Sequence, residues 1–250
     1  MSCLVRVAEW LLSSVSSRRR FDTHSPHPLY HRPPIIIMQE LLFGKVYSPR
    51  PIVVAAASIV ACPLIWNIVA RNEYKNHTLS RLLGSPRRGC YLLATWIFTS
   101  SLYRDVLFTK AVMMNNDSVL TNDSNTKGYV AAAGKALTGM GAVLVVSSMY
   151  RLGVTGTYLG DYFGFLMSAR VSGFPFNVCS DPMYAGATMQ FVGLALAANS
   201  HVGVTLSGLV AAVYYVATKW FEGPFTSYIY SNRAAAEEAA ASRAKPSLAL

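Results

Sequence analysis

Residues 52–70, IVVAAASIVACPLIWNIVA, decide the fold class, because they form nineteen consecutive residues without a charged side chain. An α-helix needs about 20 apolar residues to cross the hydrocarbon core of a bilayer, so this stretch predicts a membrane-embedded helix. Pro63 lies near its middle, and a proline inside a helix predicts a kink or a re-entrant turn. Four more apolar stretches follow, at 90–103, 129–150, 183–199 and 201–218. The sequence therefore predicts an all-α, polytopic helical membrane protein with four to five membrane-embedded helices.

Three of these stretches carry further information. The stretch that begins at Cys90 continues to Phe108 if Arg104 and Asp105 pair with each other or extend their charged ends to the membrane surface. The last two stretches leave no room for a long loop, which predicts a tight helical hairpin around Asn199 and Ser200.

The composition excludes several protein classes. Hydrophobic residues make up 52% of the chain and charged residues only 14%, whereas a soluble domain carries about 25% charged residues. An ordinary soluble enzyme, a disordered chain and a fibrous protein are therefore excluded. The net charge of +10 comes from Lys and Arg at the ends of apolar stretches, as in membrane proteins, so no nucleic-acid partner is expected. The four cysteines and five histidines show no metal-ligand spacing, so no metal site is expected.

The chain divides into three parts. Residues 1–37 contain an arginine triplet and four prolines, and we interpret them as a mobile N-terminal extension that faintly resembles a mitochondrial targeting segment. Residues 38–232 contain the five apolar stretches and form the predicted membrane-embedded domain. Residues 233–250 begin with an Ala/Glu-rich run, which predicts a helical tail outside the membrane.

The stretch GTYLGDYFG, residues 156–164, is the first candidate for chemistry. Its glycines recur every four residues, which predicts one helix face that a neighbouring backbone can approach closely. Packing alone would explain the glycines. Asp161 lies between Tyr158 and Tyr162, however, and an acid beside tyrosines at a membrane edge suits a cationic head group.

Two more motifs have both a structural and a functional interpretation. Gly139-Met140-Gly141 lacks the preceding strand and third glycine of a dinucleotide-binding loop, so no Rossmann domain is expected, and the pattern alone favours helix packing. Glu222 follows shortly after the last apolar stretch, and a carboxylate at the end of an apolar helix is costly unless it is paired, functional or solvated at the water boundary.

Taken together, the motifs resemble the phospholipid N-methyltransferases, which methylate phosphatidylethanolamine and its mono- and dimethyl forms to give phosphatidylcholine. The resemblance covers most of the chain after Met38. The order and spacing of six motifs carry it, namely WNIVAR (66–71), LSRLLGSP (79–86), GTYLGDYFG (156–164), FPFN (174–177), DPMYAG (181–186) and PFT (224–226).

This resemblance implies S-adenosyl-L-methionine as the methyl donor. The cofactor element of the family matches Gly139, Met140 and Gly141, and its acidic pair matches only at Glu222, because Gly223 stands where a second Glu is usual. The resemblance also implies a phospholipid substrate and an endoplasmic reticulum membrane, with a mitochondrial or mitochondrion-associated membrane as the alternative.

The reaction indicates which residue types the site needs. The lipid amine must lose a proton before it attacks, and Glu222 or Asp161 could hold the ammonium group or accept that proton. Tyr158, Tyr162 and Tyr184 are candidates for cation–π contacts with the methylated head group.

Two alternative functions stay open at this point. A protein prenylcysteine carboxyl methyltransferase shares the Pro-x-Tyr element seen at 182–184, and a non-catalytic membrane scaffold would need every motif to be a packing feature. The sequence leaves open which of the three methylation steps the chain performs and its oligomeric state.

The topology also has two interpretations. Positive charge places 1–50 and 71–89 on the cytosolic side, which requires a re-entrant segment at Pro63. Family members have instead been drawn with the equivalent of 71–89 in the lumen. We expect Glu222 to face the cytosol, where the methyl donor is made.

Overall fold

The computed structural model describes residues 51–115 and 120–244, and these residues form helices and turns without a β-strand. Residues 1–50, which include the expected extension, lie outside the described residues. The elements are α3 (Pro51–Asn76), α4 (Thr78–Leu83), α5 (Pro86–Met114), α6 (Ser124–Thr157), η2 (Gly160–Phe163), α7 (Pro182–Ala197), α8 (His201–Val216), η3 (Ala217–Glu222) and α9 (Gly223–Ala244). The all-α prediction is confirmed.

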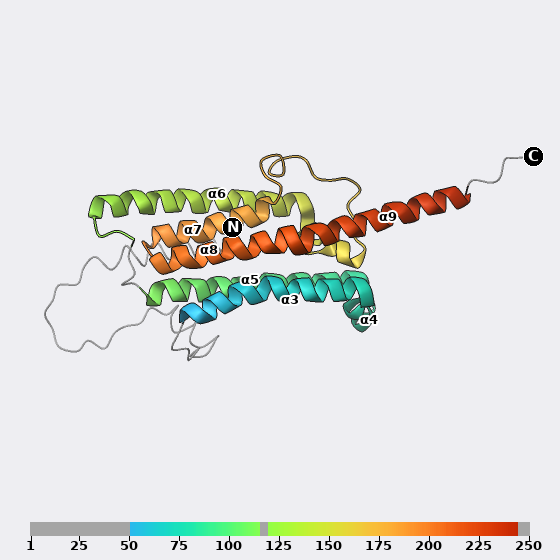
Figure 1. Ribbon diagram of the computed structural model, residues 1–250, viewed down its shortest axis with the longest axis horizontal. Helices are drawn as coiled ribbons and strands as arrows, with labels where there is room; N and C mark the ends of the chain where they lie inside the picture. Colours follow the sequence, from blue (N-terminus) through green and yellow to red (C-terminus); the bar gives the residue numbers. More distant parts are fainter. Residues whose placement is uncertain (1–50, 116–119, 245–250) are drawn as a thin grey trace, which may run out of the picture.

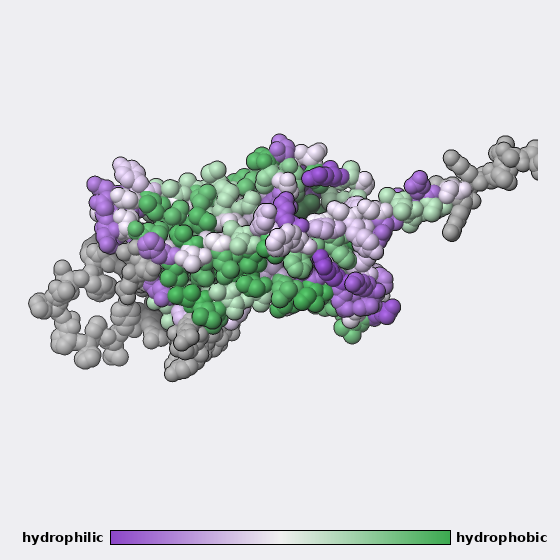
Figure 2. Space-filling view, in the orientation of Figure 1, coloured by the Kyte–Doolittle hydropathy of each residue, from purple (hydrophilic) through white to green (hydrophobic). Residues whose placement is uncertain are grey.

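The long helices lie side by side in one bundle, and α9 projects beyond it (Figure 1). Within the described part of the chain, three helical runs are long and apolar enough to cross a membrane, namely Pro51–Asn76, Ser124–Phe163 and His201–Ala240. Figure 2 shows apolar side chains over the middle of the bundle and hydrophilic ones toward its ends. Both features fit a helical membrane protein.

The first helix crosses the whole bundle. α3 is continuous through Pro63, and Figure 1 shows it running from one end of the bundle to the other. The re-entrant arrangement is therefore wrong. A proline inside a membrane helix is tolerated where neighbouring groups satisfy the backbone that it frees, and here Asn67 Nδ2 donates to the Pro63 carbonyl at 3.0 Å.

A buried carboxylate organises the turn from α3 to α5. Glu73 is fully buried, and it accepts hydrogen bonds from the backbone N–H of Leu79 at 2.6 Å and of Ser80 at 3.3 Å. It also accepts one from the Ser80 hydroxyl. These donors lie in the first turn of α4, where a carboxylate satisfies free N–H groups and complements the helix dipole. Glu73 thereby fixes the short helix that returns the chain antiparallel to α3.

Glycines allow α6 and α7 to touch along their backbones. A Cβ on Gly141 would overlap the carbonyl oxygen of Gly186, and one on Gly134 would lie 2.6 Å from that of Gly193. The glycines are seven residues apart on both helices, so they share one face on each helix. Such contacts are typical of membrane helices, which associate by close van der Waals packing.

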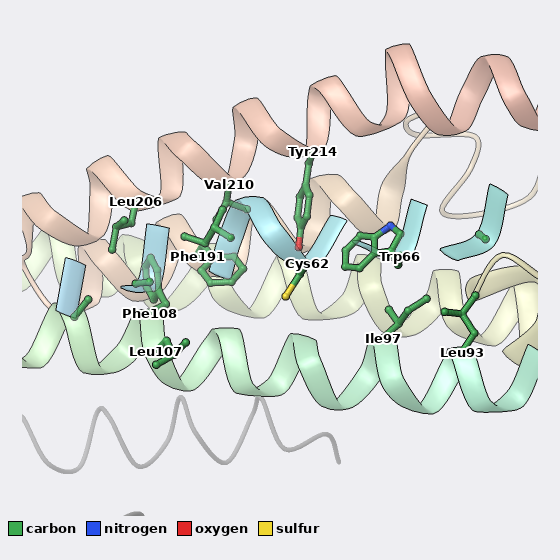
Figure 3. Close-up of a cluster of buried hydrophobic side chains, with 14 of the residues drawn as sticks. Cys62, Trp66, Leu93, Ile97, Leu107, Phe108, Phe191, Leu206, Val210 and Tyr214 are labelled. Carbon is green, nitrogen blue, oxygen red and sulfur yellow. The ribbon is translucent and has the colours of Figure 1, made fainter. Parts of the chain in front are cut away.

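The remaining core joins α3, α5, α7 and α8. Phe108 of α5 and Phe191 of α7 form an edge-to-face pair with centroids 4.8 Å apart, and Figure 3 shows Tyr214 pointing from α8 into the same cluster. The predicted hairpin is confirmed, because α7 ends at Ala197 and α8 begins at His201. Ser200 caps α8 by accepting from Gly203 N at 3.1 Å.

Candidate active site

A long cavity lies between α5, α6 and α7 and reaches the end of α8. Its volume is about 500 Å³, within the range of about 300–1,000 Å³ that small-molecule sites occupy. Residues from Ile97 to Thr109 line its α5 wall, which is about 18 Å at 1.5 Å per residue. Val145, Met149 and Leu152 of α6 also line the cavity. The cavity is therefore mostly apolar and extends deep into the bundle.

Glu222 lines one end of this cavity and is held by three donors. Its Oε1 accepts from Trp66 Nε1 at 3.0 Å and from Asn67 Nδ2 at 2.9 Å, and its Oε2 accepts from the Tyr184 hydroxyl at 2.6 Å. Trp66 and Asn67 lie on α3 and Tyr184 on α7. Side chains from α3 and α7 together fix the position of this carboxylate.

A π-helical turn places Glu222 and accounts for Gly223. Residues Ala217–Glu222 form the π-helix η3, and the Gly223 N–H donates to the Thr218 carbonyl. A Cβ on Gly223 would lie 2.7 Å from that carbonyl oxygen. A glycine therefore fits this turn, whereas the second Glu usual in the family would require the backbone to shift. Single π-turns recur at functional sites.

Asp161 lines the same cavity from η2. Its Oδ2 accepts a hydrogen bond from Thr226 Oγ1 at 3.1 Å. Thr226 lies four residues after Glu222, which corresponds to about 6 Å along a helix axis. The structure therefore brings the two predicted acids to one end of the cavity.

The segment around Asp161 differs from the sequence-based expectation. Gly156, Gly160 and Gly164 do not lie on one helix face, because α6 ends at Thr157 and Leu159 adopts a left-handed conformation with φ 56°. The short 3₁₀ turn η2 follows, and Gly164 caps its end with φ 86°. This break turns Asp161 back toward α9, where Thr226 binds it.

The three predicted tyrosines take different positions. Tyr158 and Tyr184 line the cavity. Tyr162 is buried beside it and stacks on Phe225 with ring centroids 5.1 Å apart. Within the described residues its hydroxyl has no hydrogen-bond partner. Tyr162 therefore supports the wall of the site, and its ring face is taken up by Phe225.

Gly139, Met140 and Gly141 are not among the residues that line the cavity, although Gly141 packs against the lining residue Gln190. Gly141 is in contact with α7, a Cβ on Gly139 would meet nothing within 4 Å, and Met140 is 60% exposed. Helix packing accounts for Gly141. The cofactor role of the three residues stays a prediction.

Sequence reasoning assigned no role to several residues that complete the site. Trp66 and Asn67 bind Glu222, and Arg71 Nη2 donates to the Phe221 carbonyl at 2.8 Å. All three belong to the WNIVAR motif that carries part of the family resemblance, and that motif was the available signal. Their role depends on packing against η3, which the sequence pattern does not reveal.

Comparisons with known proteins identify the family of the chain. A family model described as phospholipid methyltransferase matches residues 129–233. A phosphatidyl-N-methylethanolamine N-methyltransferase of Saccharomyces cerevisiae is 44% identical over 198 residues, which cover 79% of this chain and 93% of that protein. The chain belongs to the phospholipid methyltransferase family.

Further relatives of this phospholipid methyltransferase come from fungi and animals. A phosphatidyl-N-methylethanolamine N-methyltransferase of Emericella nidulans is 48% identical over 184 residues, which cover 72% of this chain and 85% of that protein. A phosphatidylethanolamine N-methyltransferase of Rattus norvegicus is 46% identical over 194 residues, which cover 77% of this chain and 95% of that protein. No solved structure matches the chain.

Proposed function

We propose that this phospholipid methyltransferase transfers methyl groups from S-adenosyl-L-methionine to the amine of phosphatidylethanolamine and of its mono- and dimethyl forms, giving phosphatidylcholine. The names of the relatives support this reaction, and the endoplasmic reticulum is the proposed membrane. The observation that carries the proposal is a long apolar cavity with the carboxylates of Glu222 and Asp161 at one end. Such a cavity suits a lipid whose head group is cationic.

The residues at this end fit the proposed methyl donor. S-adenosyl-L-methionine supplies a methyl group that is already activated on a positively charged sulfur atom. The negative charge of Glu222 favours that cation, and the Thr157 hydroxyl lines the cavity as a buried oxygen without a partner among the described residues. A buried polar atom of this kind is available to a ligand. We therefore assign the donor to the Glu222 end of the cavity.

The hydrogen bonds suggest a division of labour between the two acids. A carboxylate offers about four lone-pair positions, and protein donors occupy three on Glu222. Glu222 is thus held in one orientation and acts by its charge. Asp161 has one side-chain donor, Thr226, beside the backbone N–H groups of Asp161 and Tyr162, so fewer side chains restrict its carboxylate than restrict that of Glu222. Asp161 is the proposed proton acceptor and Glu222 the proposed holder of the cation.

The walls of the cavity orient the head group. Tyr158 and Tyr184 line the cavity near the acids, and their rings can contact the ammonium as its methyl groups accumulate. Fixed side chains that align the amine with the methyl group supply much of the rate in such a transfer.

The two alternative functions are less well supported. A prenylcysteine substrate carries a carboxylate, which two acids at the cavity end would repel. A scaffold has no need for a carboxylate fixed by three donors inside a cavity.

The test uses purified full-length protein, methyl-labelled S-adenosyl-L-methionine and micelles of phosphatidylethanolamine or of its mono- or dimethyl form. We expect label in the lipids, with the preferred acceptor showing which steps the enzyme performs. Asp161→Asn should lower kcat by about 10²-fold or more, because it removes the proton acceptor. Glu222→Gln should weaken donor binding, because it removes the charge.

Glu237→Gln is the matched control, because this carboxylate is exposed on α9 and pairs with Arg233 outside the cavity. It should leave the rate unchanged. An absence of label in all three lipids would overturn the proposed function, and an unchanged rate in Asp161→Asn would overturn the role of Asp161.

A further inference from the structure

A second polar centre lies along the α5 wall of the same cavity. Arg104 and Asp105 both line it, and their side chains are only 6% and 15% exposed. Arg104 donates Nε and Nη2 to Asp105 Oδ1 at 3.1 and 2.8 Å. The two residues pair, which is one of the two arrangements that the sequence analysis allowed for α5 to continue past them. Ionisable groups inside membrane proteins are costly and mark functional sites by default.

Tyr214 joins this centre from α8. Arg104 Nη1 donates to the Tyr214 hydroxyl oxygen at 2.5 Å. Because the arginine is the donor, the tyrosine keeps its own hydroxyl hydrogen, which makes no hydrogen bond to the described residues. The ring of Tyr214 lies 4.8 Å from the ring of Tyr184, whose hydroxyl binds Glu222. The second centre is therefore connected to the Glu222 end by two adjacent aromatic side chains.

Unused donors remain at this centre. An arginine has five N–H groups, and three on Arg104 have hydrogen-bond partners among the described residues. The remaining two, together with the Tyr214 hydroxyl, form a set of donors beside a cavity. Donors of this kind, with a guanidinium among them, suit the oxygens of a phosphate or carboxylate.

We propose that Arg104 and Tyr214 bind an anionic oxygen of the substrates inside this cavity, and that this oxygen belongs to the phosphodiester of the acceptor lipid. The inference rests on the proposed function. A zwitterionic head group would then place its amine at Asp161 and Glu222 and its phosphate at Arg104. Asp105 neutralises the arginine when no lipid is bound. The apolar residues near Arg104, such as Phe108 and Leu194, fit the acyl chains that follow the phosphate.

Two alternatives to a phosphodiester site make different predictions. The anionic oxygen could belong to the carboxylate of the methyl donor, which offers the same chemistry. The pair could also serve only to tie α5 to α8, since a buried ion pair joined to a tyrosine can act as a structural contact. A binding experiment with a phosphodiester lipid separates these cases.

The probe is phosphatidylmethanol, which has a phosphodiester but no amine and cannot be methylated. Its affinity for the purified full-length protein is compared with that of diacylglycerol carrying the same acyl chains. The variants are Tyr214→Phe, which keeps the ion pair, and Arg104→Gln with Asp105→Asn, which removes both charges together. We expect each variant to reduce the preference for phosphatidylmethanol, by about tenfold in the double variant.

The affinity for S-adenosyl-L-methionine, measured in parallel, identifies the source of the oxygen. The proposal expects this affinity to stay unchanged and the KM for phosphatidylethanolamine to rise. Weaker donor binding with an unchanged lipid preference would overturn the phosphodiester assignment in favour of the carboxylate. A lower melting temperature with both affinities unchanged would overturn it in favour of a structural pair.

Arg233→Gln is the matched control, because this arginine is 52% exposed on α9 and bonded to Glu237 outside the cavity. It should change none of these quantities. Phosphatidylmethanol binding does not depend on methyl transfer. A protein that binds the probe through Arg104 yet labels no lipid would overturn the proposed function and leave the anion site standing.

Discussion

At the residue scale, the position of Glu222 depends on how its donors are themselves held. The amide nitrogen of Asn67 has two hydrogens, and it donates to both the Pro63 carbonyl and Glu222. This fixes the orientation of the amide. Tyr184 provides the only described donor to Oε2 of Glu222, and its ring packs on Tyr214. Removal of one donor should therefore change the alignment of the carboxylate without unfolding the bundle.

The variant Tyr184→Phe tests this dependence. It removes the 2.6 Å hydrogen bond to Glu222 and leaves the aromatic ring in place. A hydrogen bond to a charged group contributes about 1.5–3 kcal/mol, so kcat/KM for methyl transfer should fall by about tenfold or more. Tyr215→Phe is the control, since Tyr215 is 61% exposed on the adjoining helix. Equal rates for both variants and the unmodified protein would show that this bond does not align Glu222.

At the scale of elements, the contact between α6 and α7 holds the long cavity wall in place. Gly141 and Gly186 touch through their backbones, whereas Gly139, two residues away, faces open space. The GxG motif therefore contains one glycine that packing requires and one that it does not. The difference separates the structural from the cofactor-binding interpretation of the motif.

Alanine at each glycine gives a matched pair of variants. Gly141→Ala places a Cβ against a backbone oxygen of α7 and should cost about 1–3 kcal/mol of stability, as overpacking does. Gly139→Ala meets no atom within 4 Å and should stabilise α6 by about 0.5–1 kcal/mol, because glycine is a poor helix former. Thermal unfolding in detergent and donor affinity are measured together. Weaker donor binding in a stable Gly139→Ala would support the cofactor role, and equal unfolding temperatures would contradict the packing argument.

At the scale of the whole molecule, one contact restricts the topology. Arg71 donates to the Phe221 carbonyl, so the segment at 71–89 and Glu222 lie at the same end of the bundle. Asn199 in the α7–α8 turn bonds to the backbone of Thr121 at the opposite end. Figure 1 shows the start of α6 and this turn together, far from α4. A lumenal 71–89 with a cytosolic Glu222 does not fit this arrangement.

Cysteine labelling in sealed microsomes tests the orientation. Asn76 lies at the α4 end and Asn122 at the opposite end, and both are exposed. In a background without the native cysteines, a membrane-impermeant maleimide should label Asn76→Cys directly and Asn122→Cys only after permeabilisation. We expect this labelling pattern because the Glu222 end of the bundle must bind a methyl donor that is made in the cytosol. The reverse labelling pattern would place the site in the lumen.

The sequence by itself determined the features that depend on neighbouring residues. The apolar stretches predicted the membrane helices, because bilayer crossing depends on local length and hydropathy. The lack of a loop between the last two apolar stretches predicted the hairpin around residues 199–200. The order and spacing of six motifs indicated the family. These signals also named Glu222, Asp161 and Tyr184, which the structure brings to one cavity.

Only the tertiary structure decided how these residues meet. The donors to Oε1 of Glu222 are Trp66 and Asn67, which precede it in the sequence by 156 and 155 positions. No sequence spacing encodes a contact across three helices. The glycines at 156–164 predicted a helix face, but a left-handed Leu159 ends α6 and turns Asp161 toward Thr226. Arg104 forms a hydrogen bond with Tyr214, which lies 110 positions later in the sequence. Local pattern fixes which segments are helices, whereas packing of buried side chains fixes which polar atoms share a cavity.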